Sequence, residues 1–346
     1  MTANEKIKVG ISVGDLNGIG MEVILKTFQD KRMMDFCVPV IYASSKVISY
    51  HKKALNLNIP IFVAKNESEL NPDKINCIQV WQEDVAMELG KPSKEIGEFA
   101  FKSLDAATQA VKQGKVDFLL TAPINKDNIF NDDFQFPGHT EYLGEQFEGE
   151  PLMLLTNGSL RLGLITGHIP ISKVSETIDE ELIKKKVEIM NMSLKQDFGI
   201  DRPKIAVLGI NPHCGDKGVI GSEDEDLVRP TINKIKEETK TLVFGPYAAD
   251  GFFGSRAYEE FDGVLAMYHD QGLAPFKTIA FGNGVNFTAG LKFIRTSPDH
   301  GTGYAIAGLN QANPDSFKEA LYTGLELVKL RKNYQDLTRN VLKTRG

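Results

Sequence analysis

The chain has few cysteines and no long apolar run among its 346 residues. No apolar run approaches the roughly 20 residues that a membrane-spanning helix needs, so the sequence predicts no membrane partner. The N-terminus, Met-Thr-Ala-Asn-Glu-Lys-Ile-Lys, runs into a short strand-like segment and lacks the long apolar core of a signal peptide. Cys37, Cys77 and Cys214 are odd in number and widely spaced, which suits a reducing compartment without disulfides. We therefore predict a cytoplasmic location.

The sequence also lacks a basic block. It has 46 acidic and 40 basic side chains, which give a formal net charge of −6. Nucleic-acid-binding proteins need clustered cations, so we predict no nucleic-acid partner. Neither GxGxxG nor GxxxxGK(S/T) occurs, which argues against a dinucleotide site of the Rossmann type and against a P-loop. The loop at residues 14–20 still follows a strand-like run and opens a helix, a position where backbone N–H groups can cradle phosphates.

Short apolar runs alternate with amphipathic stretches along nearly the whole chain. Strands separated by helices predict an α/β fold with a largely parallel sheet and helices on both faces. The expected strands are residues 7–13, 37–43, 75–80, 116–121, 160–166, 204–210 and 264–267, and the expected closing helix is 314–330. Thr177 and Glu180 match a capping box that opens a helix to about residue 198. The chain exceeds the usual size of one hydrophobic core, so we expect two domains.

Five of the six histidines stand where apolar runs end in glycine, proline or aspartate turns, and only His51 looks incidental. His168, His213 and His269 each follow a strand-like run that looks buried. Ligands of open α/β sheets bind beyond the carboxyl ends of the strands, where three imidazoles can converge. Such a set with open coordination positions suits a catalytic Zn²⁺ or a similar divalent ion. Each histidine alone also fits a hydrogen-bonded turn, and that alternative stays open.

A second group of candidate residues is cationic. Lys277, Asn286 and Arg295 recur at intervals of nine within apolar, glycine-broken sequence, which is unusual for a solvated face. Together with His139, Thr140 and Lys126, they would suit a small anion such as a carboxylate or a phosphate monoester. Scattered surface ion pairing explains the same residues, and the sequence alone does not separate the two interpretations.

Several longer motifs occur in one order between residues 14 and 302. They are Gly-Asp-Leu-Asn-Gly-Ile-Gly-Met-Glu22, Thr-Ala-Pro-Ile-Asn-Lys126, Pro-Gly-His-Thr-Glu141, Thr-Gly-His168, Asn-Pro-His213, Ala-Met-Tyr-His-Asp-Gln-Gly272, Gly-Val-Asn286 and Ile-Arg-Thr-Ser-Pro-Asp-His-Gly-Thr302. These motifs resemble the 4-hydroxythreonine-4-phosphate dehydrogenase family of pyridoxal phosphate biosynthesis, and the similarity covers nearly the whole chain.

The resemblance implies a fold and a set of roles. The fold would be isocitrate/isopropylmalate dehydrogenase-like, with two α/β/α domains and the active site in the interdomain cleft of a homodimer. The metal ligands would be His168, His213 and His269, contributed from both subunits, and they would act in catalysis through the metal together with Lys277. The substrate-binding residues would be His139, Thr140, Lys277, Asn286 and Arg295. The cofactors would be NAD or NADP and one divalent ion, either zinc, magnesium or cobalt.

We place the first domain at residues 1–132 plus 305–346. The second domain, residues 133–304, would carry the metal and substrate residues as an insertion, and the closing helix would return to the first domain.

The family chemistry is oxidation of 4-phosphooxy-L-threonine to a 3-oxo acid, which decarboxylates to 3-amino-2-oxopropyl phosphate. One alternative is a paralogous dehydrogenase of a phosphorylated four-carbon sugar acid, such as a 4-phosphothreonate or 4-phosphoerythronate. Others are a non-redox metalloenzyme with three histidines and a ligand-binding module without a metal.

Overall fold

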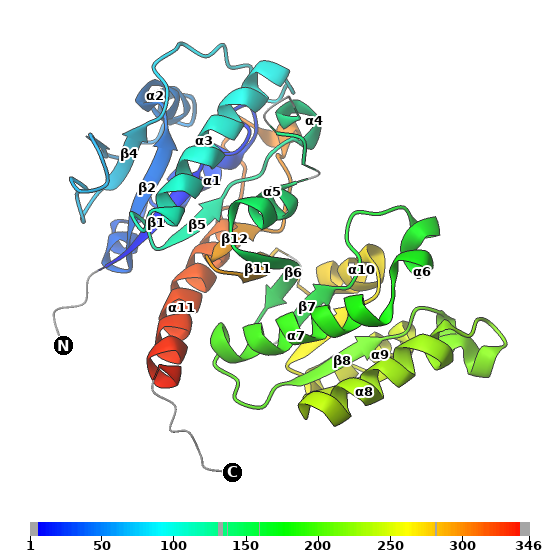
Figure 1. Ribbon diagram of the computed structural model, residues 1–346. Helices are drawn as coiled ribbons and strands as arrows, with labels where there is room; N and C mark the ends of the chain where they lie inside the picture. Colours follow the sequence, from blue (N-terminus) through cyan, green and yellow to red (C-terminus); the bar gives the residue numbers. More distant parts are fainter. Residues whose placement is uncertain (1–5, 131–133, 137, 159, 281, 340–346) are drawn as a thin grey trace. The chain divides into compact units, whose positions relative to one another are not determined.

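The computed structural model describes residues 6–130, 134–136, 138–158, 160–280 and 282–339. The chain forms two compact units (Figure 1). Unit 1 comprises Met1–Glu148 and Lys292–Glu326, and unit 2 comprises Gly149–Leu291 and Leu327–Gly346. Residues 1–5, at the start of the segment for which we predict no signal peptide, lie outside the described residues.

Unit 1 is built on a parallel sheet with the strand order β3-β4-β2-β1-β5-β12. Its strands are β1 (Ile7–Ser12), β2 (Cys37–Ala43), β3 (Ile61–Ala64), β4 (Ile75–Gln79), β5 (Phe118–Thr121) and β12 (Arg295–Pro298). The central strands are continuous apolar runs that are fully buried, as expected for a parallel sheet covered on both faces.

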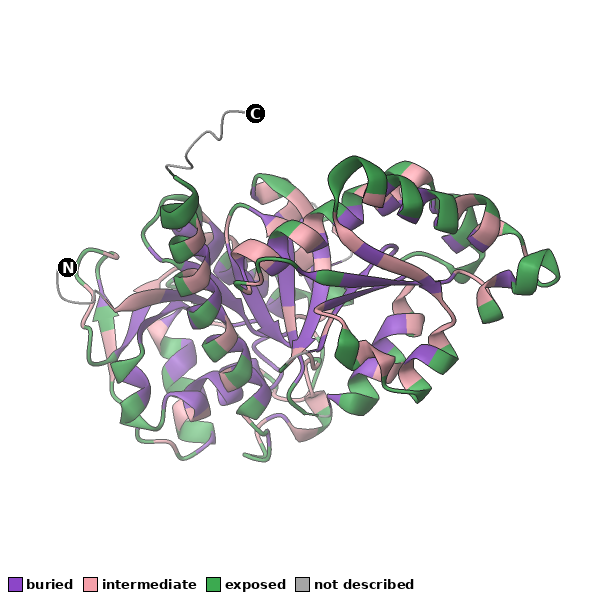
Figure 2. Cartoon of the chain, turned by 90° about the horizontal axis from the view of Figure 1, so that it is seen from below, coloured by how far each residue is buried: buried purple, intermediate pink, exposed green. Residues whose placement is uncertain are grey.

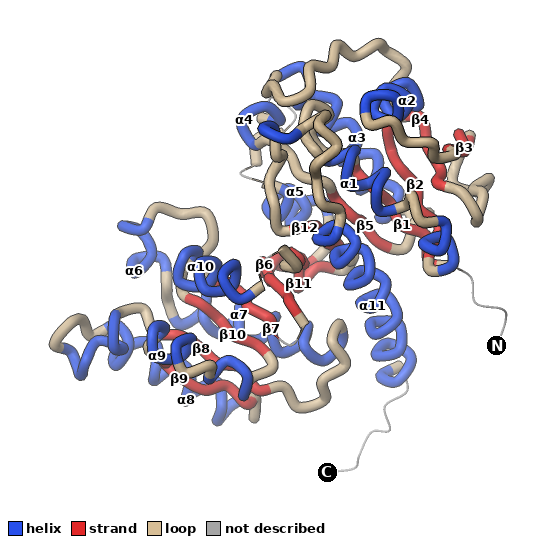
Figure 3. Tube along the Cα trace, turned by 180° about the vertical axis from the view of Figure 1, so that it is seen from behind, coloured by secondary structure: helices blue, strands red, loops and turns tan. Residues whose placement is uncertain are grey.

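The helices of unit 1 cover both faces of this sheet. They are α1 (Gly20–Thr27), α2 (Ser45–Ala54), α3 (Lys94–Lys112), α4 (Lys126–Ile129), α5 (His139–Gln146) and the first part of α11 (Asp315–Thr338). Helix α3 lies on one face, and α1 and α2 lie on the other (Figures 1 and 3). The first part of α11 packs so closely on β5 that a Cβ at Gly324 would lie 2.1 Å from the ring of Phe118.

Unit 2 has the strand order β11-β6-β7-β10-β8-β9. Its strands are β6 (Gly149–Asn157), β7 (Leu160–Leu164), β8 (Lys204–Leu208), β9 (Leu242–Tyr247), β10 (Gly263–Ala266) and β11 (Val285–Leu291). The pairs β11–β6 and β6–β7 are antiparallel, and the remaining pairs are parallel. The helices are α6 (Val174–Thr177), α7 (Glu180–Gln196), α8 (Arg229–Thr239), α9 (Ala249–Gly254) and α10 (His269–Ile279).

Helix α10 packs closely on the sheet of unit 2 because it carries a glycine at the contact. A Cβ at Gly272 would lie 2.6 Å from Leu162 Cδ2 and 2.9 Å from the Cβ of Ala266. On the same helix, Leu273 and Phe276 are buried in the core cluster with these two strand residues. Figure 2 shows that buried residues concentrate in the strands, whereas the outer faces of the helices are exposed. None of the helices in the described ranges is long and apolar enough to cross a membrane.

The predicted α/β fold is confirmed, but the domain boundaries expected from sequence differ from the two units. The expected boundary at 132/133 falls outside the described residues, and the one at 304/305 lies within unit 1. Strand β12 belongs to unit 1 because it pairs in parallel with β5. Helix α5 belongs there as well, since the Tyr142 hydroxyl donates to Asp105 Oδ1 of α3 at 3.0 Å. His139, Thr140 and Arg295 are therefore residues of unit 1, which corrects the expectation that the central segment carries every substrate residue.

Candidate active site

Three parallel strands of unit 2 end near the predicted metal ligands. Strands β7, β10 and β8 are neighbours in the sheet and run in the same direction, so their carboxyl ends share one edge. His168 follows β7, His213 follows β8, and His269 begins α10 after β10. This edge is where open α/β sheets bind ligands. The strand-end placement is confirmed, whereas metal binding by these rings stays a prediction.

His168 and His269 lie next to each other. Their ring centroids are 5.6 Å apart, and both rings line a surface cavity of about 450 Å³ together with Gly167, Tyr268 and Asp270. The Asp270 carboxylate lies 2.7 Å from Nδ1 of His269. A carboxylate on one ring nitrogen is a common partner of metal-binding imidazoles, and it leaves Nε2 as the coordinating atom.

His213 stands in a left-handed turn after β8. Its φ is 52°, and positive φ values continue through Gly218. The Asp224 carboxylate anchors the start of this turn, since it accepts the backbone N–H of Ile210 at 2.7 Å and that of Asn211 at 2.9 Å. The turn presents the His213 side chain to solvent.

The loops that carry His213 and His269 are tied together by one side chain. Gln271 donates from Nε2 to the carbonyl of Gly209 at 2.6 Å, and its Oε1 accepts the N–H of Met267 at 2.7 Å. Even so, no three His, Cys, Asp or Glu side chains lie close enough to hold a metal ion within the described ranges. The adjacent rings of His168 and His269 fit part of a divalent-metal donor set, and His213 is not grouped with them among the described residues.

Unit 1 contains a second group, the cationic cluster, which we define as Lys126, His139 and Arg295. Arg295 is only 2% exposed, and its Nε and Nη2 donate to Oγ1 of Thr121 at 3.0 and 2.7 Å. Burial lowers the pKa of Arg295 to about 9, and the Glu141 carboxylate opposes that shift. The guanidinium therefore remains positively charged at neutral pH. Because Arg295 is buried, scattered surface ion pairing does not explain its presence here.

His139 is the neutral member of the cationic cluster. Its burial, followed by the charges of Arg295 and Lys126, lowers the pKa of His139 well below the usual value, so the ring is uncharged at neutral pH. Among the described residues, its buried Nε2 has no hydrogen-bond partner. A buried polar atom left unpaired costs about 1–3 kcal/mol, unless a ligand pairs with it. Two cations beside such a nitrogen fit an anionic ligand that also carries a hydrogen-bonding oxygen.

The chain matches known proteins over most of its length. The family model described as "Pyridoxal phosphate biosynthetic protein PdxA" matches residues 35–324. The chain is 46% identical over 329 residues to the 4-hydroxythreonine-4-phosphate dehydrogenase of Bacteroides thetaiotaomicron, covering 94% of this chain and 90% of that protein. It is 40% identical to the enzyme of the same name from a Sulfurihydrogenibium species, covering 94% and 100%. The chain belongs to the PdxA family.

A solved structure agrees with this membership. The crystal structure of a 4-hydroxythreonine-4-phosphate dehydrogenase from Burkholderia phymatum superposes with a TM-score of 0.77 at 34% identity, covering 94% of this chain and 99% of that one. The PdxA-family fold is isocitrate/isopropylmalate dehydrogenase-like, so the predicted fold class is confirmed. The named relatives are dehydrogenases, so the chain is an oxidoreductase, for which a nicotinamide cofactor is implied. The non-redox metalloenzyme and the ligand-binding module are thereby set aside.

The residues that we predict to bind the substrate are divided between the two units. In unit 1, Thr140 follows His139 in the first turn of α5, while Pro137 of the same motif lies outside the described residues. In unit 2, Lys277 is exposed in the last turn of α10. Asn286 lies on β11, and its buried Oδ1 has no hydrogen-bond partner among the described residues.

The first glycine loop of this PdxA-family chain serves packing rather than phosphate binding. Its N–H groups are used internally: that of Asp15 donates to Pro123 O at 2.9 Å, and that of Ile19 donates to Thr302 O at 2.9 Å. A Cβ at Gly18 would lie 2.6 Å from the same Thr302 carbonyl. A phosphate cradle needs free N–H groups. The loop is instead a buried support for the segment that follows β12.

Two buried groups near this loop were missed by sequence reasoning. His51, which looked incidental, is 2% exposed, and burial lowers its pKa to about 4 while a backbone hydrogen bond with Leu16 partly opposes the shift. The buried Asp15 carboxylate accepts the Tyr304 hydroxyl at 2.6 Å and Nδ2 of Asn128 at 3.2 Å. These polar residues are isolated in separate segments of the chain, so no local sequence pattern indicates that they contact one another in the fold.

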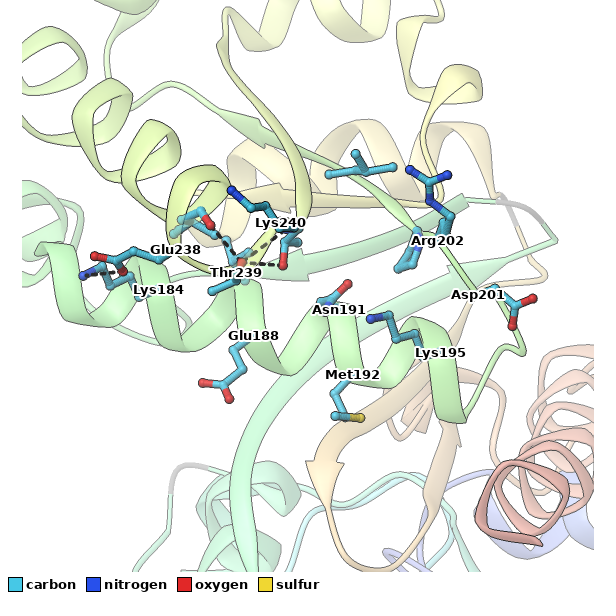
Figure 4. A pocket seen from close by; sticks show the side chains of 15 residues that line it. Lys184, Glu188, Asn191, Met192, Lys195, Asp201, Arg202, Glu238, Thr239 and Lys240 are labelled. Atoms are coloured by element: carbon cyan, nitrogen blue, oxygen red, sulfur yellow. Dashed lines mark hydrogen bonds and ion pairs between the residues drawn. The ribbon is translucent and has the colours of Figure 1, made fainter. Parts of the chain in front are cut away.

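Unit 2 also has a cavity of about 430 Å³ at the opposite edge of its sheet (Figure 4). It lies between α7 and the end of α8, beside Pro203 and Thr241, which directly precede β8 and β9. None of the predicted ligand or substrate residues lines it. Its charged rim, including Lys195 and Arg202, is solvated surface, so we do not place the active site there.

Proposed function

We propose that the protein oxidises the 3-hydroxyl of 4-phosphooxy-L-threonine with NAD or NADP in pyridoxal phosphate biosynthesis. The C3–H bond breaks as a hydride passes to the nicotinamide, and the hydroxyl proton is released. The resulting 3-oxo acid then breaks its bond to the carboxylate carbon, releases CO₂, and takes up a proton to give 3-amino-2-oxopropyl phosphate. The observation that carries this proposal is the cationic cluster around the buried Arg295, in a chain whose relatives bear that substrate in their names.

The two units supply different parts of this chemistry. In unit 1, Arg295 and Lys126 bind an anionic group of the substrate, while His139 Nε2 and Thr140 pair with its oxygens. In unit 2, Lys277 and Asn286 contact the substrate, and Lys277 is the side chain that exchanges a proton with it. Fixing the anionic group of the substrate orients the reacting carbon toward the nicotinamide.

The proposed metal site lies at the carboxyl edge of the unit 2 sheet, where strands β7, β10 and β8 end. His168, His213 and His269 would hold zinc, magnesium or cobalt, which supplies Lewis-acid polarisation of the substrate oxygen when bound. Asp270 would hold the ring of His269 in one orientation through its 2.7 Å contact with Nδ1.

We further propose a homodimer in which a second copy completes this edge. Exposed apolar side chains stand beside the histidines: Ile171 is 71% exposed near His168, and Val219 is 82% exposed near His213. Exposed apolar side chains next to an incomplete site fit an interface better than a solvated surface. The three free cysteines fit a reducing compartment, and we retain the cytoplasm as the predicted location.

Substrate comparison tests the proposal. Purified protein with added divalent metal is given 4-phosphooxy-L-threonine or 4-phosphothreonate, with NAD⁺ or NADP⁺, and reduced nicotinamide and 3-amino-2-oxopropyl phosphate are measured. We expect a higher kcat/KM for the amino substrate and formation of the aminoketone phosphate. Turnover of 4-phosphothreonate alone would establish the sugar-acid dehydrogenase instead.

A further inference from the structure

Strand register brings a polar side chain onto the buried arginine of the cationic cluster. Strands β5 and β12 run parallel, with Arg295 opposite Leu119. Side chains alternate between the faces of a sheet with a period of two, so Thr121 lies on the same face as Leu119 and Arg295. Two residues of strand span about 6.6 Å, which the long arginine side chain covers. Thr121 ends β5, so the contact lies at the carboxyl edge of the unit 1 sheet.

The contact holds one edge of the guanidinium group. Nε and Nη2 of Arg295 both donate to the single Oγ1 of Thr121, at 3.0 and 2.7 Å, and Thr121 is itself fully buried. Two donors on one oxygen hold the Nε–Nη2 edge of the guanidinium in place with Oγ1 in its plane, and the covalently attached side chain then restricts how that plane is turned. Recognition of a phosphate or a carboxylate by two parallel N–H bonds depends on that plane.

A hydroxyl suits this role better than a carboxylate would. It accepts both N–H groups without bringing a negative charge to Arg295. Burial already lowers the pKa of Arg295, and Glu141 is the carboxylate that acts against this shift. A second carboxylate at position 121 would neutralise the cation that must attract the substrate anion.

We propose that Thr121 is the positioning residue for Arg295: its hydroxyl orients the guanidinium for the substrate anion without adding a negative charge. This inference rests on the proposed function, because it assumes that Arg295 binds the substrate. Thr121 itself acts through Arg295.

Matched substitutions at position 121 test this role. Thr121→Val keeps the shape and removes the hydroxyl, whereas Thr121→Ser keeps it. We expect Thr121→Val to raise KM for 4-phosphooxy-L-threonine roughly tenfold and to weaken competitive inhibition by inorganic phosphate similarly, with kcat within about threefold. Thr121→Ser should remain within about threefold of the parent in both constants. Thr121→Asp should weaken phosphate inhibition even though it offers more acceptor atoms.

A double-mutant cycle separates the two proposals. In an Arg295→Ala background, Thr121→Val should change KM by less than about twofold, since its partner is gone. If Arg295→Ala alone keeps the parental KM, the proposed anion site is wrong and this inference falls with it. If Arg295→Ala is impaired while Thr121→Val matches the parent, or if Thr121→Val acts equally in both backgrounds, only the positioning role is overturned. Thermal melting checks folding, and Thr121→Ala replaces any Thr121→Val protein that does not fold.

Discussion

The two units present their candidate functional residues in contrasting ways. In unit 1, Arg295 is buried against Thr121 and His139 Nε2 is inaccessible, so the cationic cluster is formed within one chain. In unit 2, His168 and His213 are exposed and stand near exposed apolar side chains. A buried cation needs its partners in place when the chain folds, because desolvation is costly. An exposed imidazole pays no such desolvation cost, so the chain can fold before a metal or a second subunit contacts the ring.

The largest expected loss of activity follows substitution of the histidines at the carboxyl edge of the unit 2 sheet. Replacing His168, His213 or His269 with Ala should lower kcat/KM by roughly a thousandfold or more, since a bound metal supplies several kcal/mol of transition-state stabilisation. Metal content should fall as well, and the thermal midpoint without metal should stay near the parental value. The control is Lys173→Ala. Lys173 is an exposed residue near His168 that forms an exposed ion pair with Glu176, so its replacement should leave kcat/KM and metal content unchanged. Stoichiometric metal and normal turnover in His213→Ala would contradict the assignment.

Substitution of Arg295, the buried cation of the cationic cluster, should have a smaller effect on activity. Arg295→Ala should cost on the order of 1.5–3 kcal/mol, or roughly ten- to hundredfold in kcat/KM, because a charge-assisted contact to the substrate is lost. Arg295→Lys should also be impaired, since an ammonium cannot copy the planar guanidinium. Lys292→Ala removes an exposed ion pair with Glu148 and a contact with the Phe293 ring, and the loss in kcat/KM should correspond to less than about 1 kcal/mol. Equal kinetics of the Arg295→Ala and Lys292→Ala proteins would refute the special role of the buried cation.

The first glycine loop supports unit 1 by packing, and this can be tested by stability alone. Gly18→Ala places a Cβ 2.6 Å from the Thr302 carbonyl, so the free energy of unfolding should fall by roughly 1–3 kcal/mol. A Cβ at Gly251 in unit 2 meets no atom within 4 Å, so Gly251→Ala is the matched control and should be neutral or slightly stabilising. Denaturant unfolding measures both. Loss of phosphate binding by Gly18→Ala without loss of stability would restore the phosphate-cradle hypothesis.

Acid should destabilise the protein partly through His51. Burial lowers the pKa of this ring from 6.5 to about 4, so the unfolded chain binds a proton that the folded chain does not. Stability should therefore fall as pH drops from about 6.5 to 4, by up to roughly 1.4 kcal/mol per pH unit from this group. His51→Gln should reduce the pH dependence of the free energy of unfolding by up to about 1.4 kcal/mol per pH unit, the contribution of one proton. Denaturant unfolding at several pH values measures this. Identical slopes in the two proteins would contradict the buried neutral state.

The sequence predicted the core of the fold better than its edges. The strand expected at 37–43 matches β2, because it is a continuous apolar run that is fully buried. Strand β3 was not predicted, since it is short and lies at the sheet edge with Val63 exposed. The capping box at Thr177 and Glu180 is wrong: Asp179 accepts the N–H of Leu182 and begins α7, while the Thr177 hydroxyl donates to Lys173 O.

The candidate site likewise has parts that the sequence predicts and parts that it does not. Turn chemistry and strand ends identified His168, His213 and His269, because those signals are local. The contact of Arg295 with Thr121 spans 174 residues and depends on strand register, which no local pattern encodes. Assignment of Arg295 and His139 to unit 1 depends likewise on the pairing of β12 with β5 and the packing of α5 on α3.

Mixing two inactive variants tests most directly whether the exposed edge of unit 2 is completed by a second chain. His213→Ala and His269→Ala proteins are combined, subunit exchange is confirmed with two affinity tags, and dehydrogenase activity is measured. If one of these ligands comes from the partner subunit, half of the dimers are hybrids with one intact site of two, so activity should recover to about a quarter of the parental value. No recovery after confirmed exchange would show that each chain builds its metal site alone, and the contrast between the two units would then fail.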